Sequence, residues 1–232
     1  MAKAQVVDEH REYFLQNKVI EFEELLSNAQ LEKLRHSLES ALAAKMQISH
    51  TQFGKQSSSD LYKAGYDLWR ENEGLKKLIF IKWWAEIAGF LTRTRTVRLL
   101  ADQLFINPPK ILSLDAAAKQ QTPLLIQETK PLKECFSFQG LIAGLLLCLE
   151  KPSPAAGDEI PRQPGNGVFF APDAPFPMGN YVNQGCYLLI LYGEAKSQYI
   201  HNSQDVHCHE LKKYGYVFGD KLEERTHPTL YR

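Results

Sequence analysis

The segment Asp205-Val-His-Cys-His-Glu210 holds the densest group of metal-ligating side chains in the sequence. On a β-strand, His207 and His209 would point to one face about 6.6 Å apart along the chain, within reach of one zinc or iron ion. Asp205 would lie about 13 Å from His209 on that face, too far to share the metal. His207 and His209 are therefore the candidate metal ligands. The alternative is a pair of partly exposed histidines that hydrogen-bond on a surface strand.

Other chemistry-bearing patterns are weaker. The only His-x-Glu pair, His10 and Glu12, falls on an expected N-terminal helix, where an exposed polar pair is the simpler interpretation. The segment from Arg93 to Arg98 is the densest basic patch and could contact phosphates, or it could be a solvated helix end. No P-loop, Gly-x-Ser-x-Gly or Gly-x-Gly-x-x-Gly motif occurs. The sequence therefore offers no nucleophile or phosphate-loop motif of a known kind.

Cysteine usage and charge bound the class of protein. The four cysteines are widely spaced with no Cys-x-x-Cys pair, which predicts buried or incidental thiols: Cys135, Cys148, Cys186 and Cys208. No apolar segment opens the chain, so we expect a reduced, cytoplasmic protein. Lysine plus arginine equals aspartate plus glutamate at 27 each, so the net charge gives no footprint of nucleic-acid or membrane-surface binding.

These side chains must be positioned by a core built around the uncharged stretch 136–150. Its apolar part, Leu141 to Leu149, is far shorter than the roughly 18 to 20 residues that span a bilayer, so it predicts a buried strand. Shorter apolar runs predict further strands: Val19–Phe22, Thr96–Asn107, Leu124–Ile126, Val168–Ala171, Cys186–Tyr192 and Tyr214–Phe218. The C-terminal half is therefore expected to be a β-sandwich or barrel.

Helices are expected before this sheet. Ser27 and Gln30 form a capping box ahead of an apolar stripe that runs to Met46, and the apolar periodicity of Leu75 to Leu91 predicts one long helix. A chain of 232 residues fits one domain. We expect a mostly helical portion over 1–92, a β core over 93–222 and a polar tail over 223–232.

The order of these elements resembles the phytanoyl-CoA dioxygenase-like proteins, members of the iron(II) and 2-oxoglutarate dependent dioxygenases. The segments that carry the resemblance are Val19–Phe22 leading into Ser27–Arg35, the strand Val97–Pro109, Gly165–Asp173 and Asn183–Ile190. The same pattern is similar to an uncharacterised chlamydial protein of that fold. The resemblance implies an α+β fold, a cupin-like double-stranded β-helix (jelly roll) with N-terminal helices packed on its major sheet.

The resemblance also implies Fe(II) and 2-oxoglutarate as cofactors, held by a His-x-Asp/Glu pair and a distal histidine. The pair should lie between Thr122 and Gln139, but the sequence has no histidine between His50 and His201. The distal ligand should lie near Ala195 or Lys196. A shifted alignment brings in His201, with Lys212 or Lys213 as the basic residue for the 2-oxoglutarate carboxylate. One histidine does not make a triad, so we assign no catalytic residue and expect no cofactor.

Four hypotheses follow. The leading one is a non-catalytic descendant of the dioxygenase scaffold that binds an unknown small molecule or protein partner, or has a regulatory role, in the old cavity. The others are an active dioxygenase with displaced ligands, a metal-responsive DNA-binding regulator that uses the Arg93 to Arg98 patch, and a plain interaction module with a filled barrel. The active dioxygenase predicts stoichiometric iron and succinate formation, and the non-catalytic protein predicts neither.

Overall fold

The computed structural model describes residues 6–106, 128–152, 161–184 and 186–232. Its helices are α1 (Asp8–Asn17), α2 (Asn28–Met46), α3 (Ser58–Ala64), α4 (Glu73–Ile79), α5 (Lys82–Thr92) and α7 (Met178–Gln184). Four short 3₁₀ helices are η1 (His50–Lys55), η2 (Leu68–Arg70), η3 (Leu132–Glu134) and η4 (Glu210–Tyr214). The strands are β1 (Val19–Phe22), β2 (Val97–Ile106), β3 (Lys130–Pro131), β4 (Phe138–Cys148), β5 (Gly167–Phe170), β6 (Pro175–Phe176), β7 (Cys186–Tyr199) and β8 (Thr229–Tyr231).

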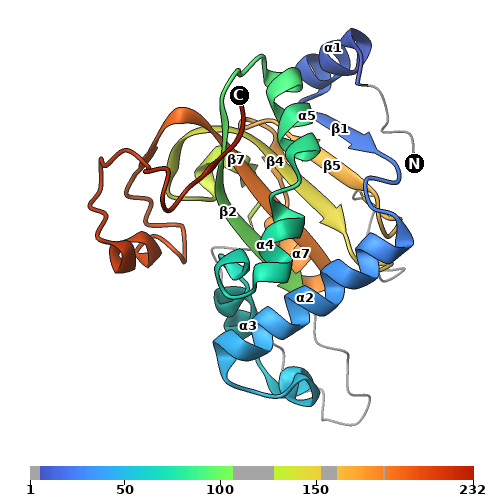
Figure 1. Cartoon of the computed structure of the whole chain (residues 1–232), viewed down its shortest axis with the longest axis vertical. Coiled ribbons are helices and arrows are strands. Elements are labelled where there is room, and N and C mark those ends of the chain that lie inside the picture. The colour runs from blue at the N-terminus through green and yellow to red at the C-terminus, as the bar shows by residue number, and fades with distance from the viewer. Residues whose placement is uncertain (1–5, 107–127, 153–160, 185) are drawn as a thin grey trace.

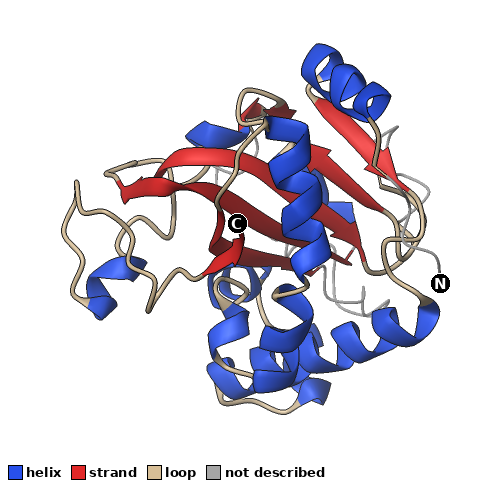
Figure 2. Ribbon diagram, turned by 45° about the horizontal axis from the view of Figure 1, so that its top comes forward, coloured by secondary structure: helices blue, strands red, loops and turns tan. Residues whose placement is uncertain are grey.

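Six strands form one curled antiparallel sheet in the order β1-β5-β4-β7-β2-β8 (Figures 1 and 2). The predicted central strand is confirmed: β4 lies between β5 and β7, and Leu145 pairs with Phe169 on one side and Ile190 on the other. The short pair β3-β6 makes a second sheet. This architecture confirms a mixed helical and antiparallel fold, and in the described residues the second sheet has two strands.

Each face of the main sheet is covered differently. Helices α1 and α5 pack on one face, against β1 and against β2 and β4, and α2 packs on α4 at the same side (Figure 1). The opposite face is covered by η3, α3 and α7 together with the β3-β6 pair. Within the described residues, none of the helices is long and apolar enough to cross a membrane.

Helix α2 begins as its sequence predicts. The Gln30 backbone N–H donates to Ser27 Oγ at 3.3 Å, and the Ser27 N–H donates to Gln30 Oε1 at 3.0 Å. This reciprocal pair satisfies two backbone donors that the first helical turn leaves without partners. The predicted capping box is therefore confirmed.

Two predicted elements are wrong. The helix expected over 75–91 is two helices, because Ile81 takes a non-helical backbone conformation between α4 and α5, while the Phe80 ring packs 5.2 Å from the Trp69 ring. No glycine or proline marks this break, so the apolar periodicity runs across it. The strand expected at Tyr214–Phe218 is a turn region, since Gly215 has a φ of +87° and ends η4.

The segment expected as a polar tail supplies part of the sheet. In β8, Thr229 pairs with Arg98 and Tyr231 pairs with Val97, so β8 closes the outer edge of β2. The short strand predicted at Leu124–Ile126 and the turn Pro108-Pro109 lie outside the described residues.

Candidate functional site

The structure separates the two predicted metal ligands. Residues 203–209 form turns rather than a strand, so the predicted shared face for His207 and His209 is wrong. The His207 ring is buried between two tyrosine rings, with centroids 4.2 Å from Tyr66 and 5.2 Å from Tyr62. The His209 ring is exposed and lies 5.8 Å from the Phe218 ring. Tight turns here replace the extended backbone that the spacing suggested.

Asp205 holds this turn region in place. Its two carboxylate oxygens accept hydrogen bonds at 2.8 Å from the backbone N–H groups of His207 and Ser137. Burial, and then the nearby lysines Lys45, Lys213 and Lys63, lowers the pKa of His207 to about 3, so this imidazole is neutral at physiological pH. His207 therefore behaves as a packed aromatic ring.

The predicted cofactor-binding residues gather at an exposed surface. His201, His209 and Lys212 surround Phe218: the His201 ring is 5.0 Å from the Phe218 ring, and Lys212 Nζ is 4.8 Å from its centroid. The His201 and His209 rings are 6.5 Å apart. Among the described residues, no group of three or more histidine, cysteine, aspartate or glutamate side chains could hold a metal ion.

The positions expected to hold iron carry other side chains. Within the described part of the window Thr122–Gln139, the carboxylate of Glu128 pairs with Lys130 at 3.0 Å; residues 122–127 lie outside the described residues. Ala195 and Lys196 are exposed on β7. His10 Nδ1 accepts from the Val7 N–H at 3.2 Å, so this imidazole supports the start of α1.

Aromatic rings pack between the main sheet and the β3-β6 pair. The Phe176 ring lies at the centre, 5.1 Å from Phe170, 5.2 Å from Tyr181 and 6.4 Å from Phe105, and Tyr181 is 5.1 Å from Tyr187. All five side chains are buried. Ferrous iron needs imidazole and carboxylate donors, and these five side chains are phenylalanines and tyrosines. The described residues therefore do not present the histidine and carboxylate set of the iron and 2-oxoglutarate centre that the resemblance implied.

A second concentration of polar groups lies along the outer edge of β2. The loop after α3 runs beside this strand: the Leu104 N–H donates to Gly65 O and the Asp67 N–H donates to Asp102 O, each at 2.8 Å. A Cβ on Gly65 would lie 2.6 Å from Leu104 O, so only glycine allows this approach. The loop thereby places Asp67 and η2 against the strand.

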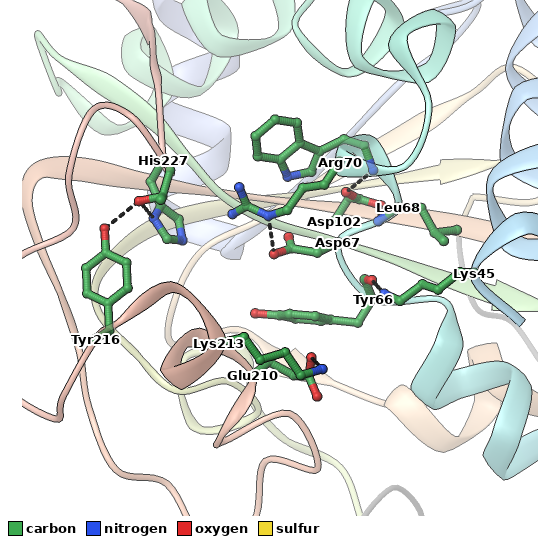
Figure 3. A network of polar contacts seen from close by, with 12 residues as sticks. Lys45, Tyr66, Asp67, Leu68, Arg70, Asp102, Glu210, Lys213, Tyr216 and His227 are labelled. Atoms are coloured by element: carbon green, nitrogen blue, oxygen red, sulfur yellow. Dashed lines mark hydrogen bonds and ion pairs between the residues drawn. The ribbon is translucent and has the colours of Figure 1, made fainter.

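Asp102 is the buried anchor of this loop. Its side chain is fully buried within an apolar strand, and its oxygens accept from the backbone N–H groups of Leu68 and Trp69, each at 3.1 Å. Burial and the neighbouring Asp67 raise the pKa of Asp102 to about 8, although those two hydrogen bonds and Lys45 oppose the shift. The ammonium of Lys45 donates to Tyr66 O at the same place (Figure 3).

Asp67 and Arg70 form an ion pair above Asp102. Asp67 Oδ2 is 2.9 Å from Arg70 Nε, and the two side chains are 6% and 13% exposed. The Arg70 guanidinium lies between two rings, 4.2 Å from the Trp69 centroid and 4.8 Å from the Tyr214 centroid. Burial raises the pKa of Asp67, and the charge of Arg70 opposes this shift. The guanidinium is thus fixed by one carboxylate and two aromatic rings.

The C-terminal segment completes the network (Figure 3). The hydroxyls of Tyr216 and Thr226 are hydrogen-bonded, and Thr226 Oγ1 is 3.0 Å from His227 Nδ1. Burial and the charges of Arg70 and Arg98 lower the pKa of His227 to about 3. Two buried nitrogens, Arg70 Nη2 and His227 Nε2, have no hydrogen-bond partner in the described part of the chain. The Arg70 Nη2 group is a donor without a partner, whereas His227 Nε2 is a donor or an acceptor according to the tautomer.

A cleft of about 620 Å³ opens over this network. Its lining comes from η2, α4 and the C-terminal segment: Trp69, Arg70, Glu71, Glu73, Lys76, Lys213, Tyr214, Arg225 and Thr226. Four of these residues are cationic and two are anionic, in a chain whose formal charge is zero. We define these residues as the Arg70 cleft. Its volume lies within the range of small-molecule sites.

The remaining candidates from the sequence are dispersed. Arg93 and Arg95 are exposed, but Arg98 is buried, donates to Leu222 O and lies 3.7 Å from Glu224, so the basic patch does not act as one surface. All four cysteines are free. Burial raises the pKa of Cys135 and Cys148 to about 12 and also raises that of Cys186, so these thiols stay protonated.

Sequence reasoning missed the Arg70 cleft. Asp102 was a usable signal, because a carboxylate inside the apolar run Val97–Ile106 requires a polar partner when it is buried. Asp67 and Arg70 gave no signal, since an acidic and a basic residue three apart are ordinary on a surface. His227 lies in the segment that was expected to be a solvated tail.

Comparisons place the fold among non-heme iron enzymes. SnoK, a non-heme α-ketoglutarate dependent carbocyclase from nogalamycin biosynthesis, has a TM-score of 0.65 at 13% identity, covering 97% of this chain and 96% of its own. SnoN, an epimerase from the same biosynthesis, has a TM-score of 0.65 at 14% identity over 97% and 98%. No family model matches the sequence. No curated protein matches it.

CT296 from Chlamydia trachomatis is 18% identical over 82% of this chain and 98% of its own, with a TM-score of 0.47. The likeness to SnoK and SnoN, at such low identity, establishes a fold shared with α-ketoglutarate dependent enzymes and leaves the activity of this chain open.

Proposed function

We propose that this protein is a non-catalytic binding or regulatory protein built on the fold of the iron(II) and 2-oxoglutarate dioxygenases. The observation that supports it is the packing between the sheets, where Phe176, its three aromatic neighbours and Tyr187 beyond them offer no imidazole or carboxylate donor. The element order supports a jelly-roll scaffold of the phytanoyl-CoA dioxygenase-like branch. Within the scaffold, binding is assigned to the Arg70 cleft rather than to the old cavity.

The aromatic packing also favours a second candidate, a plain interaction module, because that hypothesis predicted a filled barrel. The two differ at the Arg70 cleft. A cleft of about 620 Å³ with convergent polar and charged side chains suits a small molecule rather than a protein surface. We therefore place the small-molecule candidate first.

The test is turnover and metal content of the purified full chain. After incubation with Fe(II) and 2-oxoglutarate in air, we expect succinate at the level of a protein-free control, and we expect sub-stoichiometric iron after desalting. Succinate above that control, lost when His201 is replaced by alanine, would establish an active dioxygenase with displaced ligands. The variant His10→Ala is the matched control, because His10 supports α1 and should leave either result unchanged.

A further inference from the structure

The Arg70 cleft combines fixed and adjustable cationic groups. Arg70 is held at its base by Asp67 and by two rings. At the rim, the Lys213 and Arg225 side chains are 65% and 79% exposed, and each pairs with a carboxylate on the same segment, at 2.5 Å for Glu210 and 3.9 Å for Glu223. Exposed pairs of this kind contribute little to stability, so both cations can turn toward a ligand at small cost.

The cleft also offers a flat apolar surface beside these charges. Tyr214 is 41% exposed, and one face of its ring lies against the Arg70 guanidinium. A ring whose face is polarised by a guanidinium and that borders a cationic rim suits a planar group attached to an oxyanion. Thr226, whose hydroxyl bonds to Tyr216 and His227, forms the opposite part of the lining.

One buried nitrogen indicates where the oxyanion would go. Arg70 lines the cleft, its Nε is held by Asp67, and its Nη2 has no hydrogen-bond partner among the described residues. An oxyanion oxygen that reaches Arg70 Nη2 would satisfy a donor that otherwise costs free energy to bury.

We propose that the Arg70 cleft binds a small molecule that carries an oxyanion, either phosphate or carboxylate, next to a planar ring. The oxyanion is held by Arg70, Lys213 and Arg225, and the ring stacks on Tyr214. This inference rests on the proposed function, because it names the ligand class of the same binding site.

The experiment is isothermal titration calorimetry of the full chain with three probes: adenosine monophosphate, benzoate and inorganic phosphate. Inorganic phosphate tests the oxyanion alone, benzoate tests a ring with a carboxylate, and the nucleotide tests a ring with a phosphate. We expect at least one ring-bearing probe to bind about tenfold more tightly than inorganic phosphate, since stacking on an aromatic side chain contributes about 1–3 kcal/mol. The tighter of the two ring-bearing probes shows which combination of ring and oxyanion fits the cleft.

Variants locate the binding. Lys213→Gln combined with Arg225→Gln should weaken the tighter probe about tenfold, and Tyr214→Ala should reduce its advantage over inorganic phosphate to about twofold. Lys212→Gln is the matched control, because it removes an adjacent exposed cation that contacts Phe218 and does not line the cleft. Near-ultraviolet circular dichroism checks that each variant keeps its fold.

Three results would overturn the proposal: none of the probes binds, Lys212→Gln weakens binding as much as the double variant, or inorganic phosphate binds as tightly as both ring-bearing probes. These failures leave the proposed non-catalytic role standing, since they do not concern iron or succinate. Conversely, succinate formation would refute the non-catalytic role even if the cleft binds a probe.

Discussion

The space between the two sheets is stabilised by apolar packing, whereas the region of the Arg70 cleft is stabilised by polar interactions. Between the sheets, Phe176 and its neighbours are buried rings whose contribution comes from area removed from water and close packing. In the network that adjoins the Arg70 cleft, the carboxylates of Asp67 and Asp102 and the imidazole of His227 are buried and held by hydrogen bonds and by the ion pair with Arg70. The first region offers apolar packing, and the second offers charged and polar side chains around a cleft. The shared fold therefore does not by itself determine which region carries the polar groups.

The largest effect should come from Phe176→Ala. Its side chain is fully buried against three other rings, so truncation removes that contact area and leaves a cavity. We expect the free energy of unfolding to fall by about 3–5 kcal/mol, measured by urea denaturation. Val217→Ala, at a 62% exposed position, should change it by less than about 0.5 kcal/mol. A loss below about 1 kcal/mol for Phe176→Ala would contradict a packed interior.

Arg70→Ala should have the next largest effect, because it leaves the buried carboxylate of Asp67 without its cation. We expect a loss of about 3 kcal/mol at pH 8. The loss should be smaller at pH 5, since Asp67 can then take a proton. Asp67→Asn combined with Arg70→Ala removes both charges and should recover part of the stability. An equal loss at both pH values would show that the ion pair is not the cause.

The buried titratable groups predict a maximum in stability near pH 6.5. His207 and His227 have folded pKa values of about 3, below the unfolded value near 6.5, so the unfolded state binds more protons and stability rises as the pH rises from 3 to 6.5. Asp102 has a folded pKa of about 8, above its unfolded value near 3.9, so its ionisation lowers stability between pH 4 and 8.

Above pH 6.5 the histidines no longer change the free energy of unfolding, so its decline with pH comes from the carboxylates. Asp102→Asn should flatten the decline in stability between pH 6.5 and 8, measured by urea denaturation at each pH. Asp220→Asn is the matched control: Asp220 accepts from the Val217 N–H at a surface turn, and its removal should leave the slope unchanged. A steep decline that persists in Asp102→Asn would assign it to other groups.

The smallest expected effect concerns neither region. Ser27→Ala removes the oxygen that accepts from the Gln30 N–H and should lower the free energy of unfolding by about 1 kcal/mol. Thermal denaturation should detect it, and Ser27→Asp should restore most of the loss. If Ser27→Ala lowered the free energy of unfolding as much as Phe176→Ala, burial would not explain why the Phe176 substitution has the larger effect.

The sequence correctly predicted the helices and strands that are specified by residues within their own segment. The capping box at Ser27 and the uncharged stretch around Leu145 each contain their own signal, so α2 and β4 could be read from the sequence. The break at Ile81 could not, because no glycine or proline marks it and the Phe80 ring beside it packs on Trp69, which is distant in the helical pattern. His207 and His209 misled for a similar reason: their spacing suits a metal only on a strand, and the turns around Asp205 place one inside and one outside.

The candidate site was harder still, because its members come from distant parts of the sequence. Asp102 lies on β2, Arg70 follows α3, and His227 precedes β8, so no window of the sequence contains two of these elements. What brings them together is tertiary: the approach of Gly65 to Leu104 and the pairing of β8 with β2. In the sequence, only Asp102, a single carboxylate in an apolar strand, indicated that a buried polar environment was needed.

The pairing of Tyr231 with Val97 joins residues that lie 134 positions apart in the sequence. During synthesis the ribosome must release almost the whole of the described chain before this contact can form, and Thr226 and His227 are delivered only shortly before it. Contacts of such long range are slow to form. We therefore expect β8 to pair with β2 late in folding, and amide hydrogen exchange at Leu99, whose N–H donates to Pro228 O, would report how often this end of the sheet opens.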